Sequence, residues 1–321
     1  MALIDMPIEE LFKYQGISPC PADIDEYWDE ALAEMNAVEP KPEFVKKDFP
    51  AKCADMYDLY YTGTKNARIY AKVAVPKNEK GKMPAVLMFH GLSGYSGEWC
   101  ELLKYASQGY VVAYMDARGQ GGLSQDVGGV SGTTYTTPFT RGLDGDKHDL
   151  LMRDVYLDTA LLAKIIKGLD YVDETRIAVT GGSQGGGLSV ACACLVPEIK
   201  KCAIWYPYLS DYKRVGELVE LNDPGPYSGL NYYFKNFDPT HKREKEIFER
   251  LGYIDIQNLA KRMKAELLMF TGLADNACPP STQFAMYNKV TSEKEVVFYP
   301  EYNHEILKGS EDLAFEFLSN L

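Results

Sequence analysis

Short apolar runs alternate with helix-like patterns along most of the chain. The apolar runs predict eight strands, near residues 56–62, 68–76, 85–90, 111–116, 177–182, 202–207, 267–273 and 295–299. Stretches with helical spacing predict helices near 98–108, 147–167, 184–196 and 280–290, with a closing helix that begins at Glu311. Continuous apolar strands interleaved with helices are typical of a mostly parallel sheet covered on both faces. The pattern therefore predicts an α/β fold that forms a single domain over residues 1–321.

Two polar segments interrupt this alternation. Residues 1–40 are acidic and are expected to form an amino-terminal helical arm with Trp28 and Leu32 on one side. A longer insertion, from about 210 to 263, is rich in Tyr, Asn, Pro and Lys and separates two core strands. We expect this insertion to form a cap over the site at the strand ends, and plain surface decoration is the alternative.

Composition argues against several kinds of partner. The formal net charge is −12 and the chain has no basic stripe, whereas nucleic-acid binding needs clustered Lys and Arg. No signal-like segment opens the chain and no apolar run is long enough to span a bilayer, so we expect a cytoplasmic protein with no membrane partner. Among the seven cysteines, Cys192 and Cys194 fall on a helix expected to be buried, where they act as small apolar residues. No Cys/His partner pair stands at zinc spacing, so we expect no metal.

The most informative motif is Gly181-Gly-Ser-Gln-Gly-Gly186, which follows a predicted strand and opens a predicted helix. This arrangement is typical of a nucleophile elbow, in which a cramped turn presents a serine at the carboxyl edge of the sheet. It predicts Ser183 as the nucleophile and the backbone N–H of Gln184 as an oxyanion donor. An ordinary glycine-rich turn is the alternative, and the flanking strand and helix argue against it.

An acid and a histidine should follow the serine in that order, each at the end of a later strand. Asp275 ends the apolar run that starts at Glu266, and His304 lies just past the run 295–299. Two other acids, Asp211 and Asp255, are rivals that do not end a strand of this kind. Structural or solvent-facing roles are expected for the remaining three histidines, His90, His148 and His241. Ser183, Asp275 and His304 are therefore the predicted catalytic triad.

Four motifs together resemble the acetyl xylan esterase and cephalosporin C deacetylase family, carbohydrate esterase family seven. They are Arg118-Gly-Gln120, the Gly181–Gly186 elbow, Asp275 followed by Cys278-Pro-Pro-Ser-Thr282, and His304-Glu305, and the resemblance extends over nearly the whole chain. It implies an α/β-hydrolase fold and a serine esterase that removes acetyl groups from short oligosaccharides and from cephalosporin C. It also implies that no cofactor is needed and that the protein assembles as a homo-oligomer, with a hexamer suggested by the family.

Residue by residue, the resemblance places the triad on the same three positions. It places the oxyanion donors on the backbone N–H groups of Gln184 and Leu92, and Leu92 stands where the family has a tyrosine that walls the acyl pocket. A second departure is Leu150-Leu-Met152 before Arg153, where the family has a run of tyrosines. Leu92 and Tyr208 are the expected substrate contacts, and for Tyr208 a packed structural role is the alternative. Arg118 is expected to organise loops beside the site through an ion pair with a carboxylate that the sequence does not identify.

Other functions of the same fold remain open. A peptidase-like hydrolase would share the elbow but usually carries a large amino-terminal propeller, for which this chain has no room. A broad-specificity carboxylesterase would share the triad. A non-catalytic binding protein typically loses a triad member, and all three are present here. The natural acetylated substrate is not identified by the sequence.

Overall fold

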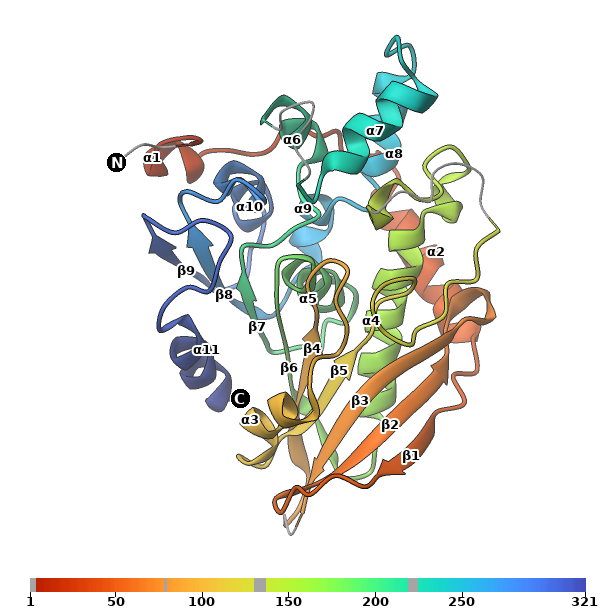
Figure 1. Ribbon diagram of the computed structural model, residues 1–321, viewed down its shortest axis with the longest axis vertical. Coiled ribbons are helices and arrows are strands. Elements are labelled where there is room, and N and C mark those ends of the chain that lie inside the picture. The colour runs from red at the N-terminus through yellow and green to blue at the C-terminus, as the bar shows by residue number, and fades with distance from the viewer. Residues whose placement is uncertain (1–3, 78–79, 130–136, 219–224) are drawn as a thin grey trace.

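One twisted sheet runs through the molecule, with helices on both faces (Figure 1). The structure is a computed structural model that describes residues 4–77, 80–129, 137–218 and 225–321. Within these residues, nine strands pair in the order β1-β2-β3-β5-β4-β6-β7-β8-β9. The strands are β1 (Glu43–Lys47), β2 (Ala54–Thr62), β3 (Arg68–Pro76), β4 (Met83–Phe89), β5 (Val111–Met115), β6 (Val172–Gly182), β7 (Lys201–Trp205), β8 (Glu266–Gly272) and β9 (Lys294–Tyr299).

The sheet is antiparallel at one side and parallel over the rest. β1, β2, β3 and β5 pair antiparallel in turn, and every pair from β5 through β4, β6, β7 and β8 to β9 is parallel. The carboxyl ends of these six parallel strands meet at one edge, where loops can gather side chains for chemistry. The predicted α/β architecture with a mostly parallel sheet is therefore confirmed.

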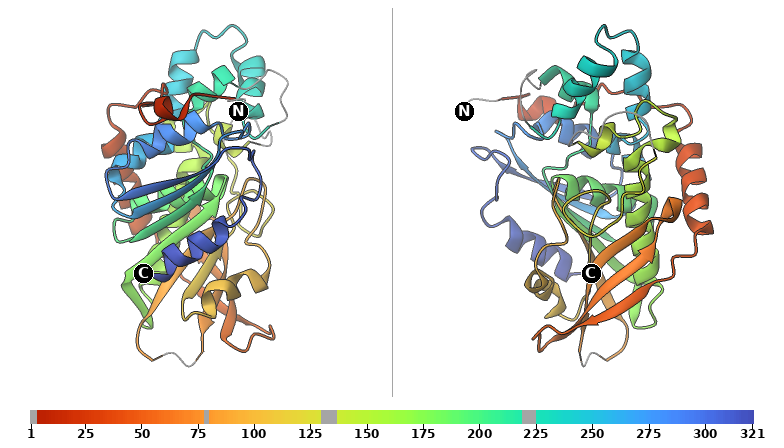
Figure 2. Two further views of the ribbon diagram at one scale, coloured as in Figure 1. Left: turned by 90° about the vertical axis from the view of Figure 1, so that its left-hand side faces the viewer. Right: turned by 45° about the vertical axis from the view of Figure 1, so that its right-hand side comes forward.

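Two apolar layers cover the sheet because successive side chains of each strand point to opposite faces. On β5, Val111, Ala113 and Met115 face the larger core, whereas Val112 faces the smaller one. The larger core packs under α2 (Ile24–Ala37), α4 (Leu151–Lys167), α5 (Gln184–Leu195) and α10 (Pro280–Tyr287). The smaller core packs under α3 (Leu103–Ala106) and α11 (Ser310–Ser319), as Figure 2 shows from the side.

The predicted elements agree closely with the observed ones, apart from shifts of a few residues at their ends and two larger differences. The helix predicted over 98–108 is a 3₁₀ turn, Trp99–Leu102, followed by the short α3. β1 was not predicted, because four of its five residues are exposed and only Phe44 is half-buried. Such an edge strand lacks the apolar alternation by which strands are recognised in a sequence.

The insertion and the start of the arm lie at one end of the molecule, and α2 of the arm runs along the side of the molecule next to α4 (Figure 1). The insertion contains α6 (Tyr212–Leu218), α7 (Ser228–Phe237), α8 (Glu244–Leu251) and α9 (Ile256–Leu259). Figure 1 shows α6, α7 and α8 beyond α5 and α10, whereas α9 packs against both of these helices. The arm contains α1 (Ile8–Leu11) and α2, and the buried Trp28 donates its indole N–H to the carbonyl of Tyr253. Residues 1–3 of the predicted arm and 219–224 of the predicted insertion lie outside the described residues.

A buried carboxylate joins the arm to the insertion. Asp211 accepts hydrogen bonds from the N–H groups of Ile17 and Ser18 and from the hydroxyl of Tyr14. Its own N–H donates to Asp255, a second fully buried acid. Burial, with repulsion from Asp211 as the second cause, raises the pKa of Asp255 to about 7. The arm is thus fixed by side chains of the insertion.

Candidate active site

The turn at Ser183 has the geometry of a nucleophile elbow. Ser183 lies between β6 and α5 with φ 57° and ψ −122°, a conformation that is unfavourable for a residue with a Cβ atom. Its N–H donates to the carbonyl of Trp205 at 3.0 Å, and its carbonyl accepts from the N–H groups of Gly187 and Tyr208 at 3.1 and 3.0 Å. Three backbone hydrogen bonds therefore hold the serine in a strained turn.

Glycines allow the helix to begin this close to the sheet. A Cβ atom on Gly185 would overlap the carbonyl oxygen of Phe89, at the end of the neighbouring strand β4. A Cβ atom on Gly181 would lie 2.6 Å from that same oxygen and from the backbone of Gly185. Side chains at these positions would push α5 away from β4 and β6, and the serine with it.

His304 and Asp275 form a hydrogen-bonded pair on the loops after β9 and β8. The distance from His304 Nδ1 to Asp275 Oδ2 is 2.9 Å, and Asp275 is fully buried. The other oxygen of Asp275 accepts from the N–H groups of Ala277 and Cys278 at 2.9 and 2.8 Å, which fixes the carboxylate. The ring of Tyr206 packs against the imidazole with 4.3 Å between ring centroids. This arrangement occupies Nδ1 and leaves Nε2 for a reacting group.

Ser183 and His304 line the same cavity. Its volume is about 660 Å³, and Gly91, Trp205 and Tyr206 contribute to its wall beside them. Residues from the segments around α3 and α11 also line the cavity, including Cys100, Lys104, Ile306 and Glu311. The cavity is thus open to a ligand larger than the acyl group itself. No described residue between 210 and 263 lines it, and the capping role of the insertion stays a prediction.

The two candidate oxyanion donors have free N–H groups. Within the described residues, neither the backbone N–H of Leu92 nor that of Gln184 donates to a protein acceptor. Gln184 is the first residue of α5 and is fully buried, so its N–H contributes to the positive end of a helix. Leu92 follows Gly91, which lines the cavity.

Tyr206, which the sequence reasoning missed, lines the cavity beside His304, and Tyr105 and Tyr114 also line it. Tyr208 is fully buried, its hydroxyl donates to the carbonyl of Pro226 at 2.7 Å, and its ring packs against Tyr227 with 4.4 Å between centroids. These contacts favour the packing alternative for Tyr208. The signal for Tyr206 is its place directly after the last residue of β7.

The other histidines and the rival acids have structural partners. Buried His90 lies 2.7 Å from the carbonyl of Gly91 through Nδ1, and its Nε2 accepts from the N–H of Ala117 at 2.9 Å. Burial lowers the pKa of His90, so this imidazole is held neutral with both nitrogens occupied. Asp255 caps α9 and accepts from Gln257. Two exposed histidines pair with acids nearby in sequence: His148 with Asp146 and His241 with Glu244.

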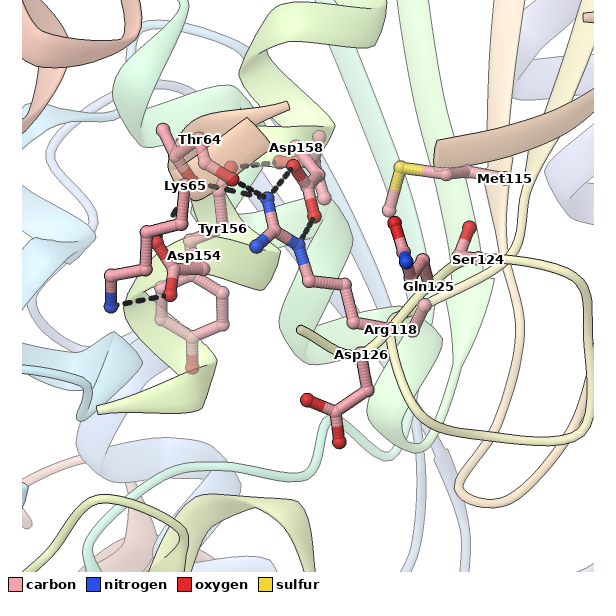
Figure 3. A network of polar contacts seen from close by, with 12 residues as sticks. Thr64, Lys65, Met115, Arg118, Ser124, Gln125, Asp126, Asp154, Tyr156 and Asp158 are labelled. Atoms are coloured by element: carbon pink, nitrogen blue, oxygen red, sulfur yellow. Dashed lines mark hydrogen bonds and ion pairs between the residues drawn. The ribbon is translucent and has the colours of Figure 1, made fainter. Parts of the chain in front are cut away.

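Arg118 forms a buried, two-pronged ion pair with Asp158 of α4 (Figure 3). Its Nε and Nη2 atoms lie 2.5 and 2.7 Å from the two carboxylate oxygens, and both side chains are 1% exposed. Nη2 also donates to the carbonyl and hydroxyl of Thr64 at 3.1 and 3.0 Å. Asp158 is therefore the carboxylate that the sequence left unidentified.

Neither a disulfide nor a metal-binding cluster occurs in the part of the chain that the structure describes. All seven cysteines are free thiols, and Cys192 and Cys194 are buried in α5. No helix among the described residues combines the length and apolar character needed to cross a bilayer.

The strained serine turn after a central parallel strand, and the histidine–carboxylate pair beyond the last two strands, define the class of α/β-hydrolases. The sequence profile described as Acetyl xylan esterase (AXE1) matches residues 1–321. The chain belongs to this family of carboxylic ester hydrolases.

Three similar proteins show how close the relationship is. Acetyl xylan esterase 1 from Thermoanaerobacterium sp. JW/SL YS485 is 51% identical, with a TM-score of 0.96 over 98% of this chain and 99% of that chain. The acetyl xylan esterase from Paenibacillus sp. R4 is 34% identical, with a TM-score of 0.93 over the same shares of the two chains. The acetyl esterase Axe7A of Xylanibacter ruminicola is 30% identical over 94% of this chain and 70% of its own length.

Proposed function

We propose that this acetyl esterase removes O-acetyl groups from short acetylated saccharides through an acetyl-enzyme on Ser183. The observation that carries the proposal is that Ser183 and His304 line one cavity, while the buried Asp275 binds the far nitrogen of His304. A serine, a histidine and a carboxylate in these relations can carry out nucleophilic acyl transfer.

In the first half of the reaction, Ser183 Oγ attacks the acetyl carbonyl carbon and its proton passes to Nε2 of His304. Asp275 fixes the imidazole tautomer and stabilises the imidazolium. The bond from the carbonyl carbon to the sugar oxygen then breaks, and that oxygen takes the proton from His304. Water attacks the acetyl-enzyme by the same route in reverse, which releases acetate and restores the serine.

The negative charge that develops on the carbonyl oxygen needs donors at the elbow. The free N–H groups of Leu92 and Gln184 are the proposed oxyanion donors, and each such donor contributes about 3 kcal/mol in comparable sites. Leu92 also bounds the acyl side of the pocket in this proposal. A smaller and more flexible wall than a tyrosine would admit acyl groups somewhat larger than acetyl.

The names of the relatives support the substrate class, because two are acetyl xylan esterases and one is an acetyl esterase. Acetylated xylooligosaccharides are therefore the first substrates proposed, and cephalosporin C is the second, from the family resemblance. The same resemblance supports a homo-oligomer, with a hexamer as the expected form. The reaction as proposed uses no metal and no organic cofactor.

The test compares Ser183→Ala with the same change at a buried serine on α5, the helix that follows Ser183. Ser183→Ala should lower kcat for p-nitrophenyl acetate by several orders of magnitude without unfolding the protein. Ser189→Ala is the control, because Ser189 is buried and bonds only the carbonyl of Gly185 among described partners. A fluorophosphonate probe should label Ser183, and His304→Ala should abolish that labelling. An adduct mapped to another residue would contradict the proposal.

The substrate class is tested separately from the mechanism. Values of kcat/KM should be measured for acetylated xylooligosaccharides, other acetylated sugars and cephalosporin C, and sedimentation should be run on the same preparation. Preference for butyryl or longer esters over acetyl esters would contradict the acetyl assignment. A monomer in sedimentation would contradict the oligomer.

A further inference from the structure

The segment 118–121 makes contact with both loops that carry the candidate oxyanion donors. Gln120 lies at the centre of these contacts. Its Oε1 accepts from the N–H of Ser93 at 2.8 Å and from Nε2 of Gln184 at 3.0 Å, and its Nε2 donates to Oε1 of Gln184 at 2.9 Å. Leu92 is the residue before Ser93, and Gln184 itself carries the other donor N–H. The side chain of Gln120 therefore forms hydrogen bonds next to both donor N–H groups, those of Leu92 and Gln184.

The turn that carries Leu92 needs such support. The N–H of Gly94 donates to the carbonyl of Gly91 at 3.0 Å, and Ser93, inside this turn, has φ 60°. A residue with a Cβ atom is disfavoured there, so neighbouring contacts must hold the turn. Gln120 holds the N–H of Ser93, and the N–H of Gly121 donates to the carbonyl of Gly94 at 2.9 Å.

The contact with Gln184 is specific because it is buried and reciprocal. Gln184 is fully buried, and its amide exchanges two hydrogen bonds with the amide of Gln120. Without Gln120, both the amide oxygen and the amide nitrogen of Gln184 would lose these hydrogen bonds, and the amide would have to turn away or take up water. Either change would move the first residue of α5.

The segment is also anchored at its other end. Arg118 stands two residues before Gln120 and is fixed to α4 through the buried ion pair with Asp158 (Figure 3). A further brace comes from Asp116, whose carboxylate accepts from the N–H groups of Ser96 and Leu123 at 2.6 Å each. The backbone on either side of Gln120 is therefore held in place by Arg118 and Asp116, which restricts the movement of Gln120.

The geometry points to Gln120 as a positioning residue that sets the distance and direction between the N–H groups of Leu92 and Gln184. This inference rests on the proposed function, in which those two N–H groups bind the oxyanion. The oxyanion exists only in the transition state, so a displaced donor lowers kcat and leaves ground-state binding nearly unchanged. A misplacement of about 1 Å can reduce the rate by about 100-fold.

The experiment replaces each amide of the pair by a side chain of similar length. Gln120→Met and Gln184→Met should each lower kcat for p-nitrophenyl acetate by roughly 10–100-fold, with KM within about twofold of wild type. The double variant should be no slower than the slower single variant, because each change already breaks the same pair. Gln125→Met is the control, since Gln125 is exposed on the same loop and its amide oxygen accepts from the N–H of Arg68 instead.

Active sites are counted by fluorophosphonate titration, so that kcat refers to folded enzyme. The rate of fluorophosphonate labelling should fall in parallel with kcat, because that adduct also places an oxygen in the oxyanion site. Wild-type kcat in either single variant, multiplicative losses in the double variant, or a loss that disappears after titration would each overturn the inference. Failure of the proposed function is a different result, in which Ser183 is neither labelled nor required.

Discussion

Replacing Asp158 by Asn should destabilise the protein by about 3–5 kcal/mol, because it leaves the charge of Arg118 unpaired in the interior. Both side chains are 1% exposed, so water cannot replace the lost carboxylate. Asn also turns one of the two acceptors into an N–H donor that faces the guanidinium. Nη1 of Arg118 already lacks a partner among the described residues, and only Thr64 would still bind Nη2.

Urea unfolding at a fixed protein concentration, followed by the fluorescence of the three tryptophans, would measure the loss. The matched control is Glu198→Gln, which neutralises the surface pair of Lys167 and Glu198 and should cost about 1 kcal/mol or less. In that pair the side chains are 26% and 48% exposed, so solvent compensates for the charge. The contrast isolates burial as the cause.

A double variant gives the sharpest check. Arg118→Met with Asp158→Leu removes both charges together and should be less destabilised than Asp158→Asn alone, because no unpaired charge remains. The reasoning would be refuted if Asp158→Asn lay within about 1 kcal/mol of wild type. It would also be refuted if the double variant lost as much stability as the two single variants added together.

Three further results are expected. Burial raises the pKa of Asp255 from 3.8 to about 7, so the folded protein holds a proton that the unfolded chain releases. The stability of the protein should therefore fall as pH rises from about 4 to 7. In thermal melts, Asp255→Asn should reduce this dependence of stability on pH. Gly185→Ala should lower kcat by about 100-fold or more because its Cβ would overlap the carbonyl oxygen of Phe89. Gly216→Ala is the control and should keep a kcat near that of wild type, because its Cβ would lie 3.5 Å from the nearest atom. Leu92→Tyr should sharpen the preference for acetyl over butyryl nitrophenyl esters by about 1–3 kcal/mol per methylene, and an unchanged kcat/KM ratio would remove Leu92 from the acyl pocket.

Features that depend on neighbours in the chain could be predicted from the sequence. The elbow is a run of six residues between a strand and a helix, and the structure has β6 ending at Gly182 and α5 beginning at Gln184. Asp275 and His304 each follow an apolar run, and parallel strands bring such ends to one edge of the sheet. Their catalytic roles remain predictions that this geometry supports.

Features that depend on packing could not be predicted in the same way. The partner of Arg118 lies on α4, and the sequence does not identify it because the pairing depends on how this helix packs against the loop. Tyr206 and Tyr208 are two residues apart, yet one lines the cavity and the other is buried among aromatic rings. The backbone between them turns, with φ 34° at Tyr206, so strand alternation no longer indicates which side chain faces the site.

The outermost position of β9 has a consequence for how the enzyme loses activity. Among the described strands, β9 pairs with β8 alone, and most of its side chains are half-buried. His304 lies on the loop that follows this strand, so the candidate base depends on an edge of the sheet that we expect to open before the core unfolds. We therefore expect mild denaturant to abolish esterase activity reversibly, at concentrations where circular dichroism still shows the secondary structure of the folded protein.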